Sequence, residues 1–271
     1  MIDRVMTFFD RVDNIPRILH QQRFSSRLSL PPCHPDFPHP ALLHAICGCA
    51  ARWVDGNDYR ESFITDQVTL CKKAIFDALE DPTSLLDTVR ALVILTRLLL
   101  DEARMMDCWT YGGFVSQMIL PLRWHLRAAQ PTSDWDTIPS PLVDQLDRSE
   151  GHMIFWMAFL QETIASLGSG LGGSFALDEI TAPLPAAACH LDFGSHQSPP
   201  NPQHIDSPDL WSNHPVNDPF VMVIKAAILL NRANKYARLW KARQYDGSRD
   251  DFVGAHSAEF RSLTDAIGCF Q

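Results

Sequence analysis

The chain has 271 residues, 46% of them hydrophobic, which is enough to bury a large core without disulfides or a structural metal. Its 23 Lys and Arg against 32 Asp and Glu give a net charge of -9, which repels phosphate backbones and argues against a nucleic-acid-binding surface on this chain. The seven cysteines lack framework spacing and fit reduced thiols, and no apolar run is long enough for a signal peptide or a bilayer span.

Helical periodicity dominates the sequence. Apolar residues recur at spacings of three and four, while strict alternation is scarce. This pattern predicts an all-α fold, a large multi-helix bundle of paired antiparallel helices. The predicted helices span residues 1–12, 40–55, 59–79, 84–100, 107–128, 141–167, 218–243 and 250–270.

Some of these helices carry packing signals. Residues 84–100 are apolar nearly all round near their middle, which places this helix at the centre of the bundle. Gly112 and Gly113 would allow close approach of a neighbour, and Pro121 would kink its helix by removing one backbone hydrogen bond.

Residues 184–219 are rich in Pro, Ser, Asn, His and Asp and show little apolar periodicity. Such a composition buries too little surface to offset the entropy of ordering, so it predicts one long mobile loop. We therefore expect a helical domain over 1–185, a loop over 186–217, and C-terminal helices of the same domain over 218–271.

Basic residues recur at spacings of three and four in the helix that follows this loop. The spacing is typical of the solvated face of an amphipathic helix, and a local basic patch for nucleic acid is the alternative. The residues are Lys225, Arg232, Lys235, Arg238, Lys241 and Arg243.

Two short motifs resemble sites but have a structural interpretation. Residues 168–173 satisfy G-x-G-x-x-G, yet a helix precedes them where a dinucleotide site needs a strand, so a glycine-rich helix end is favoured. Cys47 and Cys49, two apart on a helix, point about 200° apart and are expected to be small core residues.

Two clusters could in principle bind metal. Asp101, Glu102 and Asp107 have the wrong spacing for one helix face and are expected to form a loop and a helix cap. The other cluster lies in the predicted loop, where its spacings match no structural zinc pattern. Its members are Cys189, His190, Asp192, His196, His204, Asp206, Asp209 and His214.

Three ordered motifs resemble those of a known family. The first is F…P-I-L-H…F…P-x-L-L-x-A-I, carried by Phe9, Val12, Ile15–Pro16, Ile18–His20, Arg23–Phe24, Pro40–Leu43 and Ile46. The second is W-x-x-x-G-x-A-x-R-x-A-x-x-L-G-L-H, carried by Trp109, Gly113, Val115, Ile119, Leu122 and His125. The third is W-W-x-x-F-x-x-D-R-x-x-S-x-x-x-G-R-P with D-I-x-x-P-L-P, carried by Phe155–Trp156, Phe159, Glu162, Ser166, Gly170, Asp178, Ile180 and Pro183–Pro185.

These motifs resemble the fungal-specific transcription factor domain, or middle homology region, of fungal binuclear zinc-cluster regulators. Gln117 and Arg123 depart from the usual Arg and Gly of the second motif, and Thr163, Leu171 and Gly172 depart from the third. The resemblance implies a nuclear, non-enzymatic regulatory domain that acts through transcriptional machinery or co-regulators. Binding of a small effector and masking of activation or DNA-binding regions are two alternatives for its control. A homodimer stays open.

The resemblance also bears on zinc and DNA. A binuclear cluster needs two C-x2-C-x6-C triplets, and this sequence has neither, so we expect no cofactor in this chain and no DNA contact except through a zinc cluster elsewhere. Because the chain starts almost at the first motif, we expect a fragment, a split gene model or a homologue that has lost its DNA reader.

Bundle interiors commonly hold ligands, so an interhelical effector cavity is predicted from position. Large aromatic residues at helical spacing usually fill a packed core, which is the favoured interpretation of the aromatic ones. The predicted cavity residues are Trp109, Tyr111, Gln117, His125, Trp156 and Glu162. No catalytic, cofactor-binding or metal-binding residue is predicted. The alternatives are a helical metal-dependent enzyme that uses the carboxylates at 101–107, and a helical scaffold for protein partners.

Overall fold

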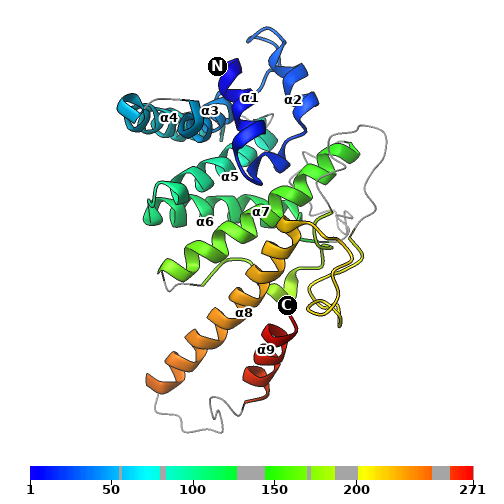
Figure 1. Cartoon of the computed structure of the whole chain (residues 1–271). Helices are drawn as coiled ribbons and strands as arrows, with labels where there is room; N and C mark the ends of the chain where they lie inside the picture. Colours follow the sequence, from blue (N-terminus) through cyan, green and yellow to red (C-terminus); the bar gives the residue numbers. More distant parts are fainter. Residues whose placement is uncertain are drawn as a thin grey trace.

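The helices of the protein, in a computed structural model, stack one on the next (Figure 1). The structure describes residues 1–54, 57–79, 84–126, 144–169, 172–186, 201–245 and 257–270. Its α-helices are α1 (Ile2–Arg11), α2 (Gln21–Leu28), α3 (Pro40–Val54), α4 (Asn57–Ala78), α5 (Leu85–Asp101), α6 (Met105–Leu122), α7 (Gln145–Ser169), α8 (Pro219–Tyr245) and α9 (Ala258–Cys269). Two short 3-10 helices, Ile15–Ile18 and Leu177–Glu179, join them, and over the described ranges no strand is present, which confirms the all-α class.

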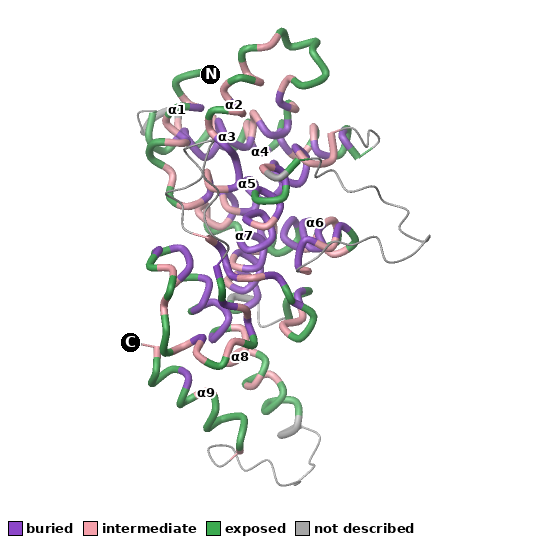
Figure 2. Tube along the Cα trace, turned by 90° about the vertical axis from the view of Figure 1, so that its right-hand side faces the viewer, coloured by how far each residue is buried: buried purple, intermediate pink, exposed green. Residues whose placement is uncertain are grey.

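Packing follows the order of the chain. Each helix from α3 to α9 packs on the next one, and α1 covers α3. In Figure 1 the stack runs from α3 and α4 through α5, α6 and α7 to α8 and α9. Helix α5 is buried on nearly its whole surface, as its apolar sequence predicts, and the buried trace of α5 and α7 runs through the centre of Figure 2. No helix in the described ranges is long and apolar enough to cross a bilayer.

A buried ionic network joins α2, α5 and α7. Asp87 on α5 accepts hydrogen bonds from Arg27 (2.6 and 3.0 Å) and from Arg90 (2.9 Å). Arg90 also pairs with Glu150 on α7, whose other oxygen accepts from the backbone N–H of His20 at 2.7 Å. Burial alone would raise the pKa of Asp87, but the hydrogen bonds and charges of the two arginines outweigh it and lower that pKa below its usual value.

The close helix approach expected at Gly112 and Gly113 is found at Gly48 instead, and Pro121 lies near a helix end. A Cβ built on Gly48 of α3 would lie 2.7 Å from Leu98 Cδ2, so this glycine is what allows α3 and α5 to approach closely. A Cβ on Gly112 would make only an ordinary contact at 3.9 Å, and one on Gly113 would meet nothing within 4 Å. Pro121 lies in the last turn of α6, which ends at Leu122, so it stands near the helix end and not in its middle.

The expected mobile loop is wrong for its second half. Residues 187–200 lie outside the described part, but 201–217 fold against the helices. Leu210 is fully buried, and the N–H of Leu184 donates to the carbonyl of Gln203 at 2.8 Å. Lys225 of α8 packs against this segment and is only 1% exposed. The spacing of the basic residues in α8 suggested a solvated face instead.

Lys225 is held by neutral acceptors. Its Nζ donates to Gln203 Oε1 (2.7 Å) and to the carbonyls of Leu210 (2.9 Å) and Asn213 (2.8 Å), and it lies 2.9 Å from His214 Nδ1. Burial lowers the pKa of Lys225, while the charge of Asp209 opposes this effect. The lysine therefore ties α8 to the folded 201–217 segment.

Candidate functional site

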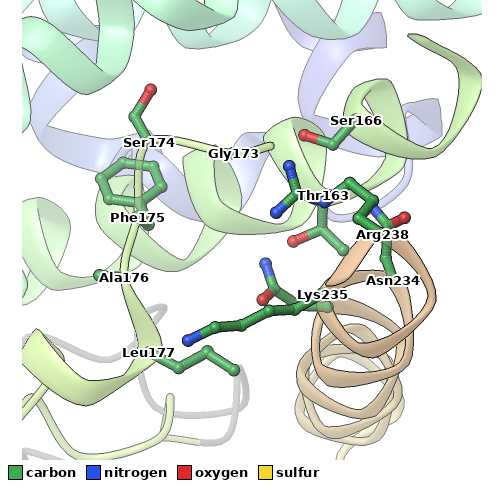
Figure 3. A pocket seen from close by; sticks show the side chains of 11 residues that line it. Thr163, Ser166, Gly173, Ser174, Phe175, Ala176, Leu177, Asn234, Lys235 and Arg238 are labelled. Atoms are coloured by element: carbon green, nitrogen blue, oxygen red, sulfur yellow. The ribbon is translucent and has the colours of Figure 1, made fainter. Parts of the chain in front are cut away.

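One face of α8 is polar where it passes α7. Asn231, Asn234, Lys235 and Arg238 recur at positions i, i+3, i+4 and i+7, so they lie on one side of the helix. Together with Thr163 and Ser166 of α7 they line a pocket of about 180 Å³. The segment 173–177 closes its remaining wall, and Figure 3 shows the side chains of both helices turned toward it.

Two glycines at the end of α7 make room for charged side chains. A Cβ built on Gly172 would overlap the Arg238 guanidinium. A Cβ on Gly173 would lie 2.9 Å from Glu162 Oε2. Any larger residue would push these side chains from their places, so Gly172 and Gly173 leave the space that Arg238 and Glu162 occupy.

Glu162 fixes this segment to the helices. Its carboxylate accepts hydrogen bonds from Ser116 Oγ of α6 (3.0 Å) and from the backbone N–H groups of Ser174 (2.7 Å) and Phe175 (3.2 Å). The side chain is only 8% exposed. A buried carboxylate that accepts three hydrogen bonds is well compensated, and here it joins three parts of the chain behind the pocket wall.

An aromatic cluster lies beneath the same wall. The ring of Phe175 packs edge-to-face on Phe155 (5.4 Å between centroids) and tilted on Phe159 (6.5 Å), and Trp156 packs on both of these α7 rings. Trp156 Nε1 donates to the carbonyl of Pro183 at 2.8 Å. The pocket wall is thereby anchored in the core.

The pocket wall carries two positive charges. Among the described residues that line it, Lys235 and Arg238 are charged and none is a carboxylate. Among the described residues neither cation has an acidic partner within 4 Å. Since the whole chain has a net charge of -9, this is a locally positive cavity in an acidic molecule.

The six predicted cavity residues do not line this pocket, nor the wider hollow of about 840 Å³ among residues 205–212, α8 and α9. On α6, Trp109 is 39% exposed and Gln117 is also exposed. Tyr111 is buried, and the Lys72 ammonium lies 4.7 Å from the centre of its ring.

The other three predicted cavity residues belong to the core near the pocket. Trp156 lies in the aromatic cluster and Glu162 supports the pocket wall. His125 packs against Phe155 at 6.3 Å, and its carbonyl accepts from the N–H groups of Thr181 and Ala182. Burial lowers the pKa of His125, whose Nδ1 has no hydrogen-bond partner among the described residues. A shared effector cavity of all six residues stays a prediction.

The acidic residues of the enzyme alternative are each paired with a basic side chain. Asp101 accepts from Arg97 at 2.9 Å, Glu102 from Arg52 at 2.6 Å, and Asp107 from Lys72 at 3.2 Å and from Arg104. Each ion pair occupies one oxygen of its carboxylate and offsets the negative charge.

In the ranges that the structure covers, no group of three or more His, Cys, Asp or Glu side chains is placed so that it could hold a metal ion. Cys189, His190, Asp192 and His196 lie outside those ranges. Cys47 and Cys49 are buried, and burial raises the pKa of both thiols, which confirms the interpretation of small core residues.

The comparisons with known proteins now decide the family. The model of the fungal specific transcription factor domain matches residues 5–236. The chain belongs to this family. A comparison with curated proteins found no match, and neither did one with solved structures.

The fungal transcription factor domain extends further along the chain than the three motifs. The motifs end near Pro185, whereas the match continues into α8 as far as residue 236. It therefore includes Asn231, Asn234 and Lys235, while Arg238 lies two residues beyond its end. Two residues of the third motif, Glu162 and Ser166, support or line the pocket.

Sequence reasoning missed the α8 residues of the pocket. The spacing of Asn231, Asn234, Lys235 and Arg238 was visible, but it also describes a solvated face. The signal that could have found them is the pair of asparagines, because short amides are poor helix formers and are rarely placed in the middle of a long helix without a partner.

Proposed function

We propose that the chain is the regulatory domain of a fungal transcription factor, and that it controls DNA-templated transcription in the nucleus. The observation that carries this proposal is the family match over residues 5–236. It is a family of transcription factor domains and not of enzymes. DNA and zinc would be bound by a zinc cluster outside these residues, since no C-x2-C-x6-C triplet occurs among them.

Contacts with co-regulators or the transcriptional machinery are the proposed route of action. An exposed apolar surface on α4 and α6 supports this route. Phe76 (52% exposed) and Phe114 (43% exposed) meet edge-to-face at 6.3 Å, and Leu79 (56% exposed) lies one turn along from Phe76. We name these three residues the α4–α6 surface. Exposed aromatic clusters are typical of protein interfaces. A homodimer through this surface is the competing outcome.

A reporter experiment tests the proposal. The 271-residue chain is fused to a heterologous DNA-binding domain and expressed in a fungal cell with a reporter that carries the matching operator. A regulatory domain changes reporter transcription several-fold relative to the DNA-binding domain alone. An unchanged reporter, with the fusion shown to be nuclear, folded and bound to the operator, contradicts the proposal.

Effector binding is a second proposed role of the domain. The effector would bind between α7 and α8. The support is the pocket itself, which lies where α8 joins the helical stack and is walled by residues anchored in the core. Occupancy of such a junction would change how firmly α8 packs, which is the kind of difference between two states that an effector must create.

A further inference from the structure

We propose that the pocket between α7 and α8 binds a small oxyanion, a carboxylate or phosphate group of a compact metabolite, through Lys235 and Arg238. The binding itself is a property of the pocket. Its role as the effector site of the domain rests on the proposed function above.

The charge of the pocket selects the sign of the ligand. The described residues that line it include two cations and no carboxylate, and neither cation has an acidic partner in these ranges. Several other arginines on the described helices, among them Arg27, Arg90 and Arg97, have acidic partners. A pocket that gathers two uncompensated cations in a chain of net charge -9 favours a ligand with negative charge.

The placement of Arg238 favours an oxyanion over a halide. Its planar guanidinium can donate two parallel hydrogen bonds to a carboxylate or a phosphate. Gly172 leaves the space that this guanidinium fills, and Figure 3 shows it turned toward Thr163 and Ser166 across the pocket. Its Nε is buried and has no acceptor among the described residues, so a ligand in the pocket would accept from the terminal Nη groups of the guanidinium.

Neutral donors complete the site. Asn231, Asn234 and Thr163 line the same cavity and carry neutral groups that can donate hydrogen bonds. The backbone N–H groups of Ser174 and Phe175 are already held by Glu162, so recognition would come from side chains. The Glu162 carboxylate does not line the pocket, and three hydrogen bonds hold it behind the wall.

The volume limits the size of the ligand. Pockets for drug-sized ligands have roughly 300–1,000 Å³, whereas this one has about 180 Å³. At about 30 Å³ per water molecule, it holds the equivalent of about six waters. A short dicarboxylic acid or a small phosphorylated compound fits this space, and a nucleotide or a folded peptide does not.

Calorimetric titration of the complete chain tests the proposal. The probes are inorganic phosphate, succinate and citrate, with succinamide as the neutral counterpart of succinate. Saturable binding of at least one anion, with no binding of succinamide, is expected. A preference for phosphate over the two carboxylates, or the reverse, identifies the chemical source of the oxyanion. The proposal is overturned if none of the three anions binds saturably at concentrations up to roughly 10 mM, since a dissociation constant above that value would mean very weak binding.

Variants locate the site. Lys235→Gln and Arg238→Gln should each weaken binding at least tenfold. Lys235 is exposed, so its substitution leaves the fold intact even if Arg238→Gln does not. Lys241→Gln, which removes an exposed charge of α8 outside the pocket, is the matched control and should leave the affinity unchanged. Equal affinities for Lys235→Gln and Lys241→Gln would overturn the proposal.

The binding experiment tests the anion site and the reporter experiment tests the regulatory function, so a negative result in one is distinguishable from a negative result in the other. Anion binding without an effect of the fusion on the reporter would leave the site and refute the regulatory function. A regulated reporter without anion binding would leave the function and refute the site.

Discussion

Glu162 is the residue on which the pocket wall most depends. Glu162→Gln keeps the size of the side chain but replaces one acceptor oxygen by an NH2 group, which would face a backbone N–H. An unsatisfied buried donor costs roughly 1–3 kcal/mol, so we expect the free energy of unfolding to fall by that amount. Urea unfolding measures it. Glu61→Gln on the exposed side of α4 is the control, and an equal effect of both substitutions would contradict the role of Glu162.

His152 predicts a pH dependence of stability. Its Nε2 accepts from Trp156 Nε1 at 3.1 Å, and loss of hydration lowers its pKa from 6.5 to about 4. Between these values the unfolded chain takes up a proton that the folded chain does not, so stability is complete above pH 6.5 and is lost as the pH falls toward 4. His152 should contribute about 2 kcal/mol of this loss between pH 7 and pH 5.

The variant His152→Gln isolates this contribution. Urea unfolding of the natural chain and the variant at pH 7 and pH 5 gives the change in the free energy of unfolding for each. The change should be smaller in the variant by about 2 kcal/mol. The same change in both chains would mean that His152 titrates alike in the folded and unfolded states.

The burial of single side chains was the hardest property to predict from the sequence. Lys225 has the spacing of a solvated face, yet it is buried because the carbonyls of Leu210 and Asn213 surround its ammonium group. Those acceptors are backbone carbonyls of a segment without apolar periodicity. Every residue has such a carbonyl, so the sequence does not indicate which ones accept from Lys225. Trp109 shows the opposite case, since a family motif residue suggested an interior position and the side chain is 39% exposed.

At the scale of elements, the close approach of α3 and α5 rests on Gly48. Gly48→Ala would place a methyl group against Leu98 in a packed core, where overpacking costs roughly 1–3 kcal/mol. Gly113→Ala on α6 meets open space and should gain about 1 kcal/mol from helix propensity. Thermal or urea unfolding of both variants should show Gly48→Ala less stable than Gly113→Ala. Equal stabilisation by the two substitutions would contradict the close packing of α3 on α5.

Long helices with strong periodicity were predictable, and short or loop elements were not. Helices α3, α4, α5 and α8 match their predicted spans closely because their apolar stripes are long. Helix α2, Gln21–Leu28, was missed because Phe24 is its one buried side chain and its position depends on the ionic network around Arg27. Residues 201–217 were missed because backbone and amide hydrogen bonds, not apolar periodicity, hold them in place.

At the scale of the whole molecule, the order of packing explains where the pocket lies. The helices stack in chain order, so α8 adds to the bundle mainly through α7 and α9. Its polar face toward the end of α7 therefore stays open enough to form a cavity. Composition and periodicity predicted the all-α class, whereas the function came from family motifs alone, because a helical bundle is compatible with many activities.

The α4–α6 surface gives a prediction for the regulatory output. Phe76→Ser with Phe114→Ser removes exposed aromatic area and should bring the reporter output of the fusion back toward that of the DNA-binding domain alone. Ile267→Ser, which removes an exposed apolar side chain of α9 (57% exposed), is the control and should leave the output unchanged. Equal output of the double variant and the natural fusion would show that partners bind elsewhere.

Reporter transcription by the natural fusion is the most direct test of the regulatory function. Transcript is measured in cells that express the fusion and in cells that express the DNA-binding domain alone at equal operator occupancy. The family membership of residues 5–236 predicts a several-fold difference between the two, in either direction. Equal transcription from a folded, nuclear and operator-bound fusion would contradict a regulatory domain.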